Sequence, residues 1–467
     1  MKNLIFTLAT IFCLFITVNS QTQIWGCAQN GGATGQGTIF SADGNGGNFQ
    51  NQYSLVNATG AMPVGNCLYA NNGKLYGVTY MGGCNDSCVC YMFDPISGTW
   101  TNFHDLYCDI SHGWDGWGGM IQASDNNLYG LCSQGGANGL GVVYKVDPTT
   151  NTYTDIHDLD STNGINPYGS LVQLSDGKLY GMTRSGGAAN YGVIFNFDPS
   201  NSTYTVLHSF DGTTGGNPEY GTIIQASDGK LYGMTNGGGV NNVGVIFSFD
   251  MSSNTYTKLH DFDGTHGGNP FENLIQATDG KLYGLTYMGG YYNDGVLFSF
   301  NITTSTYTDL FEFTGVNTGA NPTRSVMQAS NGKLYGTAFS GGASNMGVAF
   351  SYDINYNAYT KLVDFNATIG SNPDCGFIET PQMTTGIPAI TDNAVGVYPN
   401  PATSVLNITQ SKFTTITITN VLGEEVYNQA INNSTPTAVD VSNWSKGVYL
   451  LQLKSETETL VKKVVVE

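Results

Sequence analysis

A Leu-Tyr-Gly step recurs along most of the chain, and this repetition constrains the fold more than any other feature of the sequence. Ile24-Trp25-Gly26 is a degenerate first copy, and successive copies lie 51, 53, 51, 52, 51 and 52 residues apart. The tyrosines of the six regular copies are Tyr76, Tyr129, Tyr180, Tyr232, Tyr283 and Tyr335. This regular period is longer than the roughly 20 to 47 residues of solenoid repeats and predicts seven units of the size of a propeller blade.

One copy contains four strand-like runs, for which residues 223–260 serve as the example. The runs cover residues 223–226, 231–234, 245–249 and 256–260. Asp228-Gly229 joins the first two runs and predicts a type I′ hairpin, in which both turn residues take positive φ. Residues 261–270 then form the longest connection of the unit. Four strands followed by one crossover predict a β-propeller blade.

The two ends of the repeat array complement each other. The first copy begins at its second strand, residues 23–27, while the last copy supplies an unpartnered first strand at residues 377–379. Pairing these segments completes a seventh blade and removes two exposed sheet edges. It also predicts that the Cα atoms of Cys27 and Cys375 lie within the roughly 4.4 to 6.8 Å of a disulfide. An open right-handed solenoid is the alternative, because a period alone does not fix closure.

The sequence as a whole indicates an all-β protein of four segments. Residues 1–20 carry Lys2, an apolar run and a small residue at Ser20, which is typical of a signal peptide. We expect a seven-bladed β-propeller of four-stranded blades over residues 21–380 and a linker over 381–393. Alternating strands over residues 394–467 predict a small immunoglobulin-like β-sandwich. No other segment reaches the roughly 18 apolar residues of a membrane span, so no transmembrane segment is expected.

Charge and cysteine content narrow the range of partners. A net charge of −19 with only two arginines excludes a phosphate-reading surface, so nucleic acid is not expected as a partner. Eight cysteines follow the signal peptide, and an even count in an exported chain predicts disulfides. The cluster Cys84, Cys88 and Cys90 is the alternative metal site, but a second ligand pair at zinc-finger spacing is missing. We therefore predict no metal and no cofactor.

The repeat unit resembles a known family of exported bacterial proteins. The quoted segments are SDGKLYGMT, GVIFSFD, YTKLHDF and GGNP, and they resemble the Gloeo/Verruco (GloVer) tandem repeats over about residues 22–380. That family is defined by its repeat, so the resemblance implies an exported repeat protein and no particular activity. The first two copies depart from the pattern at Gly26-Cys27 and Cys67-Leu68-Tyr69, so their blades are expected to differ in shape.

The last segment resembles the type A C-terminal sorting domain of the type IX secretion system of Bacteroidetes. YPNPA, NVLGEEVY, KGVYLLQL and KKVVV occur in the order of that family. The positions that match its signature are Tyr398, Pro399, Asn400, Pro401, Gly447, Tyr449, Lys462 and Lys463. The resemblance implies that the type IX secretion machinery is a partner and that the protein passes the periplasm to be secreted or displayed on the outer-membrane surface. It also implies removal of the domain on release or on attachment to surface lipopolysaccharide.

The sequence contains no clear catalytic motif. Ser227-Asp228-Gly229-Lys230 lacks the Trp of a sialidase box, and glycosidic chemistry needs two carboxylates across a cleft. Glu219, Glu272, Glu312 and Glu379 include no pair that stands out. A histidine recurs at one repeat position, and this repetition favours packing over metal ligation. These residues are His104, His157, His208 and His260. No catalytic residue is predicted.

Positions that vary between copies are the candidate ligand contacts. The slot four residues beyond each Leu-Tyr-Gly tyrosine holds Gln29, Tyr80, Ser133, Arg184, Asn236, Tyr287 and Phe339. Trp114 and Trp117 lie where other copies have Gly-Gly-Asn-Pro. Tyr80, Trp114, Trp117, Arg184 and Tyr287 therefore form the candidate set for a polar, stacking ligand such as a glycan. Unselected loop variation is the alternative explanation of the slot, and a packing role is the alternative for the tryptophans.

A further repeated position carries glutamine on the first strand. Gln122, Gln173, Gln225, Gln276 and Gln328 occupy it, joined by Tyr69 and Glu379. We expect a structural ladder of amides there, with a ring around a channel as the alternative. The sequence thus favours a binding or interaction module. A secreted polysaccharide hydrolase or lyase and a structural surface-layer role remain open.

Overall fold

The computed structural model describes residues 22–106, 113–381, 396–409, 413–420, 424–431, 437–455 and 459–467. The predicted signal peptide lies outside these residues, as does the predicted linker apart from Pro381. The chain divides into two compact units, Met1–Met383 and Thr384–Glu467, which are described separately.

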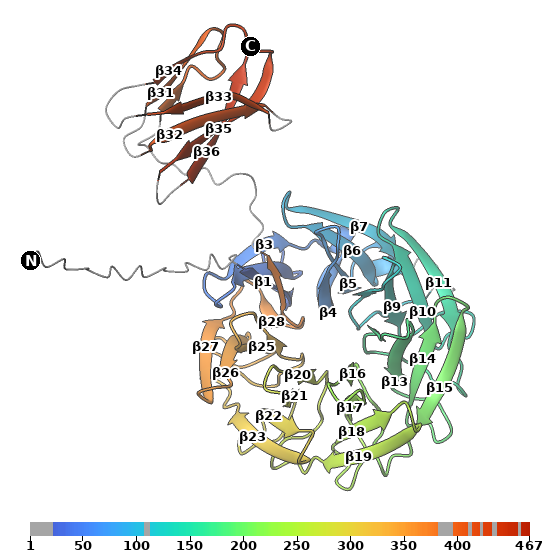
Figure 1. The fold of residues 1–467 in the computed structure, drawn as a ribbon. Coiled ribbons are helices and arrows are strands. Elements are labelled where there is room, and N and C mark those ends of the chain that lie inside the picture. Colours follow the sequence, from blue (N-terminus) through green and yellow to red (C-terminus); the bar gives the residue numbers. More distant parts are fainter. Residues whose placement is uncertain are drawn as a thin grey trace, which may run out of the picture. The chain divides into compact units, whose positions relative to one another are not determined.

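The described residues of the first unit form seven antiparallel sheets. Figure 1 shows that these sheets are arranged in a ring. In six of them the chain passes from the innermost strand to the outermost one, as expected of propeller blades. The first two of these blades contain β4 (Ala61–Tyr69), β5 (Leu75–Met81), β6 (Val89–Asp94) and β7 (Thr99–Asp105), then β8 (Ile121–Gln122), β9 (Leu128–Cys132), β10 (Val142–Asp147) and β11 (Thr152–Asp158). The only helical turns in the described part of the chain are η1 (Asn57–Thr59) and η2 (Cys84–Asp86).

The next four blades repeat the same order. They contain β12 (Val172–Gln173), β13 (Leu179–Thr183), β14 (Val193–Asp198) and β15 (Thr203–Ser209), then β16 (Ile224–Gln225), β17 (Leu231–Thr235), β18 (Val245–Asp250) and β19 (Thr255–Asp261). The last two contain β20 (Ile275–Gln276), β21 (Leu282–Thr286), β22 (Val296–Asn301) and β23 (Thr306–Glu312), then β24 (Met327–Gln328), β25 (Leu334–Ala338), β26 (Val348–Asp353) and β27 (Ala358–Asp364).

The remaining sheet closes the ring with strands from both ends of the array. Its strands are β1 (Thr22–Asn30), β2 (Thr38–Asp43), β3 (Gln50–Ser54), β28 (Ser371–Pro373) and β29 (Ile378–Pro381). β29 pairs antiparallel with β1, and Trp25 lies opposite Ile378. Cys27 and Cys375 form a disulfide with Cα atoms 5.2 Å apart. Both predictions of the closed ring are confirmed, and the open solenoid is wrong.

The hairpin between the first two strands of a blade differs from the prediction. Gly229 has a φ of +82°, but Asp228 is not among the residues with positive φ. Gly229 N–H donates to the carbonyl of Ala226 at 2.9 Å, and Ala226 N–H donates to the carbonyl of Lys230 at 3.0 Å. This is a three-residue loop with glycine in the left-handed position, not a type I′ turn. Asp228 accepts hydrogen bonds from Lys230 N–H and the Tyr232 hydroxyl instead.

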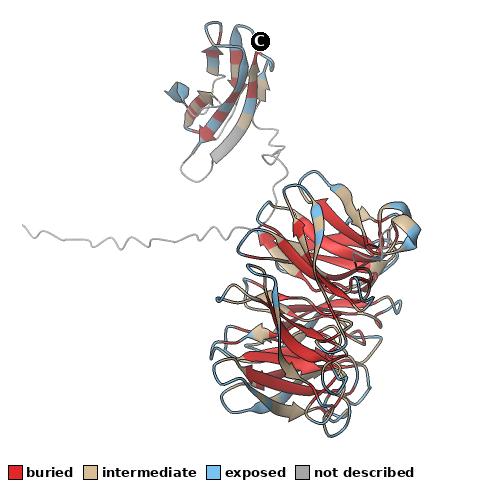
Figure 2. Cartoon of the chain, turned by 90° about the vertical axis from the view of Figure 1, so that its right-hand side faces the viewer, coloured by how far each residue is buried: buried red, intermediate tan, exposed pale blue. Residues whose placement is uncertain are grey.

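The glycine of the Leu-Tyr-Gly step makes room for an aromatic ring of the third strand. A Cβ atom on Gly233 would lie 2.6 Å from Phe247, and one on Gly284 would lie 2.6 Å from Phe298. The second and third strands of each blade are accordingly almost wholly buried, while the outermost strand is partly exposed (Figure 2). The core of the ring thus lies between neighbouring sheets.

The repeated histidines stack on tyrosines of the next blade. The ring of His208 lies 4.0 Å from that of Tyr256 with an interplanar angle of 2°. Phe311 takes the same position against Tyr359, at 4.0 Å and 5°. Because phenylalanine replaces histidine with the same geometry, the position serves packing, as predicted.

The glutamine ladder joins neighbouring blades. Gln276 Oε1 accepts a hydrogen bond from Ser227 N–H of the preceding blade at 2.8 Å, and its Nε2 donates to the carbonyl of Gly280 at 2.9 Å. Equivalent bonds between blades are accepted by Gln122, Gln173, Gln328 and Glu379. The predicted structural ladder is confirmed at these positions.

The cysteines form fewer disulfides than the even count predicts. Besides the Cys27–Cys375 bridge, Cys84 is also disulfide-bonded. Four others are free, buried thiols, namely Cys67, Cys88, Cys90 and Cys132. The prediction is wrong for these four, because they lie as small apolar side chains within hydrophobic clusters between blades.

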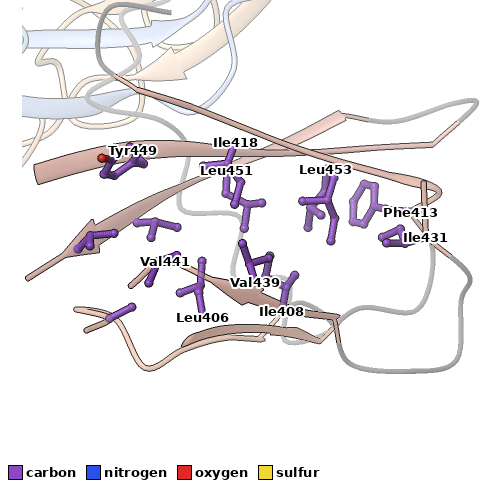
Figure 3. Packing of buried hydrophobic residues seen from close by; sticks show 14 residues of the cluster. Leu406, Ile408, Phe413, Ile418, Ile431, Val439, Val441, Tyr449, Leu451 and Leu453 are labelled. Carbon is purple, nitrogen blue, oxygen red and sulfur yellow. The ribbon is translucent and has the colours of Figure 1, made fainter. Parts of the chain in front are cut away.

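The second unit contains two sheets with a shared core (Figure 3). One sheet consists of β30 (Gly396–Tyr398), β31 (Val405–Thr409) and β34 (Thr437–Asp440), and the other of β33 (Glu425–Ala430), β32 (Thr415–Asn420), β35 (Gly447–Lys454) and β36 (Thr459–Val466). Leu406 and Val439 of the first sheet face Ile418 and Leu451 of the second. The two-sheet arrangement follows the alternation of the sequence, and β30 and β33 are additional strands. The immunoglobulin-like assignment stays a prediction.

Candidate functional site

The variable positions of several blades meet in a cavity of about 190 Å³, hereafter the central cavity. Its lining comes from the sheets of β1, β9, β17, β21 and β25. The lining residues are Gln29, Trp117, Tyr220, Phe271, Tyr287, Thr323, Arg324, Phe339 and Asp374. Gln29, Tyr287 and Phe339 are members of the variable slot predicted from the sequence.

A row of aromatic rings runs along the lining. Tyr80 lies 4.6 Å from Trp117, and Trp117 lies 5.5 Å from Tyr220. Tyr220 stacks on Phe271 at 5.4 Å, and Phe271 lies 4.6 Å from Tyr287. Five consecutive rings therefore present apolar surface and polar edges in one place, as in sites that hold amphipathic ligands.

A buried ion-pair cluster adjoins these rings. Arg324 is only 3% exposed, and its guanidinium lies over the ring of Tyr220, 5.7 Å from the centroid. Its Nε donates to Asp374 Oδ1 at 2.8 Å and its Nη1 donates to Glu272 Oε1 at 3.1 Å. Burial lowers the pKa of Arg324, but the charges of Asp374 and Glu272 outweigh burial and raise the pKa above its ordinary value. The guanidinium stays charged, as a buried cation with two partners must.

The remaining carboxylate oxygens of this cluster are also engaged. Asp374 Oδ2 accepts a hydrogen bond from Gln29 Nε2 at 2.7 Å. Glu272 Oε2 accepts one from Ser325 N–H at 2.7 Å. Each of the four oxygens thus has a protein donor, which fixes both carboxylates in position.

Two polar atoms at the cavity have no hydrogen-bond partner among the residues that the structure describes. They are Nε1 of Trp117, which can only donate, and Oγ1 of Thr323, which can donate and accept. Both residues line the central cavity. Buried polar atoms are normally paired, so these two groups are suited to a bound polar ligand.

The other predicted ligand residues lie around this cavity to different extents. Tyr80 is 36% exposed and reaches the site through its contact with Trp117. Arg184 lies over the ring of Tyr168 at 5.9 Å and pairs with Glu219, Nε to Oε1, at 3.0 Å. Burial raises the pKa of Glu219 although Arg184 opposes this effect.

Trp114 does not line the central cavity. It packs against the hydrophobic cluster between the blade of β4 to β7 and the blade of β8 to β11, and its backbone bridges to Gln134. The neighbouring Ser111 and His112 lie outside the described residues. The packing alternative considered for the tryptophans thus describes the position of Trp114, whereas Trp117 also borders the cavity.

Two parts of the site were not predicted from the sequence. They are the aromatic lining residues that precede the ladder glutamines and the ion-pair cluster of Arg324. The position five residues before the ladder glutamine holds Trp117, Tyr168, Tyr220 and Phe271 in four consecutive copies. That run of aromatics was a signal available in the sequence. The structure also brings together a carboxylate pair that the sequence does not indicate, because Glu272 and Asp374 share Arg324 although they are 102 residues apart.

The signature residues of the second unit connect its first and last strands. Asn400 Nδ2 donates to the carbonyl of Lys463 at 2.9 Å, and Asn400 Oδ1 accepts from Val465 N–H at 2.8 Å. Tyr398 is half exposed beside this connection. The hydroxyl of Tyr449 donates to the carbonyl of Ser445 at 2.7 Å, with its ring in the core.

One group of possible metal ligands occurs among the described residues. It consists of Cys27, Cys67 and Cys375, whose sulfurs lie within 4.8 Å of one another. Two of these sulfurs form the ring-closing disulfide, so they offer no thiolate. Burial raises the pKa of the Cys67 thiol to about 11, while a hydrogen bond with Tyr91 lowers it.

The fold and the cavity define a closed β-propeller in which three of the variable positions, Gln29, Tyr287 and Phe339, line one cavity. Residues 15–226 and 215–392 match the model of the Gloeobacter/Verrucomicrobia repeat. The chain therefore belongs to the Gloeobacter/Verrucomicrobia repeat family. Residues 396–467 match the secretion system C-terminal sorting domain, which implies export through the type IX secretion system to the cell surface or the medium.

Solved structures with a similar fold are distant in sequence. A putative 6-phosphogluconolactonase from Bacteroides uniformis is 14% identical with a TM-score of 0.52, covering 77% of this chain and 99% of that one. Another from Bacteroides fragilis is 15% identical with a TM-score of 0.52, covering 78% and 99%. At these identities the likeness shows the fold alone. No curated protein matches the chain. Among the described residues, no helix is long and apolar enough to cross a membrane.

Proposed function

We propose that this exported propeller is a carbohydrate-binding module whose ligand occupies the central cavity. The observation that carries the proposal is the combination of stacked rings with two unpartnered polar groups, Trp117 Nε1 and Thr323 Oγ1. A sugar has apolar C–H faces that pack on aromatic rings and hydroxyl groups that bond to such polar atoms. Tyr80, Trp117 and Tyr287 supply rings in this proposal, and Arg184 belongs to its rim.

The state of the carboxylates favours binding over hydrolysis. A glycosidase needs one carboxyl group that delivers a proton and a second one that attacks or activates water. Both oxygens of Glu272 and both oxygens of Asp374 already accept hydrogen bonds from the protein. Two carboxylates held in this way are suited to positioning Arg324 and the lining, and they are poorly placed for proton transfer.

A glycan array with the purified propeller tests the proposal. The double variant Trp117→Phe/Thr323→Val keeps an aromatic ring at position 117 and the size of the side chain at position 323, and it removes both unpartnered polar groups. Loss of two hydrogen bonds should weaken glycan binding about tenfold or more. Tyr291→Ala is the matched control, because Tyr291 is exposed and outside the lining.

The result separates three functions. Binding that depends on Trp117 and Thr323 without release of product supports the module. Release of reducing ends from a polysaccharide would instead support the hydrolase or lyase alternative. If neither assay responds, a structural role at the cell surface is the better explanation.

Delivery completes the proposed function. We propose residues 1–20 as a signal peptide for export to the periplasm and residues 381–393 as the linker before the sorting domain. Tyr398, Pro399, Asn400, Pro401, Gly447, Tyr449, Lys462 and Lys463 are the proposed sorting signal. Release into the medium and attachment to surface lipopolysaccharide are the two proposed end states.

A further inference from the structure

The charges at the central cavity restrict the ligand that it can hold. Arg324 and Asp374 line the cavity, and Glu272 lies behind Arg324. One guanidinium therefore faces two carboxylates, which leaves this cluster with a net negative charge. The nearest other arginine, Arg184, does not line the cavity and is paired with Glu219.

Among the described residues that line the cavity, the one cation is Arg324, whose charge is already paired with two carboxylates. Arg324 is almost fully buried, and its Nε and Nη1 each already donate to a carboxylate. An anion bound in the cavity would lie close to the negatively charged carboxylate of Asp374 and would be repelled by it. At the short distances inside a small cavity, such repulsion between like charges is large.

The aromatic lining also disfavours an anionic ligand. Trp117, Tyr220, Phe271 and Tyr287 present rings whose faces carry the negative end of the quadrupole. Such faces attract C–H groups and ammonium groups and disfavour anions. The charge cluster and the rings are independent features, and both exclude a carboxylate, phosphate or sulfate.

The hydrogen-bonding groups at the cavity include both acceptors and donors. Each Asp374 oxygen accepts one bond from the protein, and a carboxylate has about four acceptor sites in all. Acceptor capacity therefore remains on Asp374 and on Thr323 Oγ1, while Trp117 Nε1, the Thr323 hydroxyl and the remaining N–H groups of Arg324 can donate. Hydroxyl groups of a ligand match both kinds of partner, and an ammonium group matches the acceptors.

The size of the cavity limits how much of a glycan enters it. Its volume of about 190 Å³ lies below the roughly 300 to 1,000 Å³ of pockets for drug-sized ligands. One sugar residue is a ligand of this smaller class. The rest of a chain would lie outside, where Tyr80 continues the row of rings.

From these features we infer that the central cavity binds one sugar residue at the end of a glycan, and that this residue is uncharged or carries an ammonium group. The inference rests on the proposed carbohydrate-binding function and names the class of ligand. Uronic acids and phosphorylated or sulfated sugars are excluded by Asp374 and the aromatic faces.

Matched methyl glycosides test this inference by titration calorimetry with the intact propeller. The series contains the neutral hexose, the 2-amino sugar and the uronic acid in the gluco, galacto and manno configurations. In the configuration that binds, the neutral or amino sugar should bind at least about tenfold more tightly than the uronic acid at low salt. The preference of the amino sugar over the neutral one should decrease as salt increases.

The variant Asp374→Asn provides a second measurement. It removes one negative charge with little change in shape, so it should reduce the discrimination between amino sugar and uronic acid. If this variant does not fold, the comparison of ligands on the unaltered protein still decides. A uronic acid that binds as tightly as its neutral counterpart overturns the inference but leaves the proposed function standing. Absence of binding by every sugar of the series, and by the glycan array, overturns both.

Discussion

The disulfide that closes the ring should make a large contribution to the stability of the propeller. Cys27 and Cys375 are 348 residues apart, so the bridge closes a loop of about 350 residues. In the chain-entropy model a loop of this length corresponds to about 6 kcal/mol at 25 °C, and removal of a native bridge usually costs about 2 to 5 kcal/mol. We expect a loss of about 3 to 6 kcal/mol in the free energy of unfolding when the bridge is removed.

The experiment must also account for Cys67. Its sulfur lies within 4.8 Å of both bridge sulfurs, so it can replace a partner that has been mutated. The comparison is therefore between Cys67→Ser, which keeps the bridge, and Cys27→Ser/Cys67→Ser, which cannot form it. Both proteins share the altered contact with Tyr91, so that contact cancels.

Urea unfolding followed by tryptophan fluorescence measures the difference. The Cys67→Ser protein should unfold at a higher urea concentration when both proteins are oxidised, and reduction, which also breaks the disulfide of Cys84 in both, should bring the two proteins to the same midpoint. If the two oxidised variants unfold at the same midpoint, the bridge does not stabilise closure. The pairing of β1 with β29 would then hold the ring without it.

Three further outcomes follow from the repeated frame and the sorting domain. Burial lowers the pKa of His208 below its ordinary value of 6.5, so the stability that the neutral imidazole contributes is full above pH 6.5 and is lost as the pH falls. His208→Phe, which copies the packing of Phe311, should reduce this loss of stability. Thermal unfolding between about pH 6.5 and 5 measures the difference. Gly169→Ala should destabilise by about 1 to 3 kcal/mol because its Cβ would lie 2.2 Å from the Gly221 carbonyl oxygen, whereas Gly221→Ala, with 3.5 Å to the nearest atom, should change stability little. Deletion of residues 394–467 should leave a folded propeller that stays in the periplasm, and efficient surface appearance of that truncation would contradict the sorting function.

The residues that recur in every copy could be predicted because each makes the same contacts in every blade. The buried Leu-Tyr-Gly strand, the ladder glutamines and the ring closure all follow from period and complementarity of the ends. The type I′ turn was predicted wrongly because the dipeptide Asp228-Gly229 suits two turn classes, and hydrogen bonds from Lys230 and Tyr232 to the aspartate select the three-residue loop. The free thiols were missed because their burial between blades depends on tertiary packing.

The central cavity was only half predictable, since its lining combines positions that the sequence shows with contacts that only closure of the ring creates. The slot that contains Tyr287 is visible as a variable position in a repeat. The pairing of Asp374 with Arg324 and Gln29 is different, because Gln29 and Asp374 meet only when the two ends of the array join. No local pattern indicates that contact.

The central cavity lies beside a repeat position at which glycine is replaced by charged residues. Four residues before the ladder position, four consecutive copies carry glycine, at positions 65, 118, 169 and 221. A Cβ on Gly118 would lie 2.1 Å from the Gly169 carbonyl oxygen, and one on Gly169 would lie 2.2 Å from the Gly221 carbonyl oxygen. The backbones of neighbouring copies therefore touch directly at these positions. The next two copies carry Glu272 and Arg324, which need space and find it by pairing with each other and with Asp374. These charged side chains thus occupy the part of the ring where the glycines stop, and Arg324 and Asp374 form one wall of the central cavity.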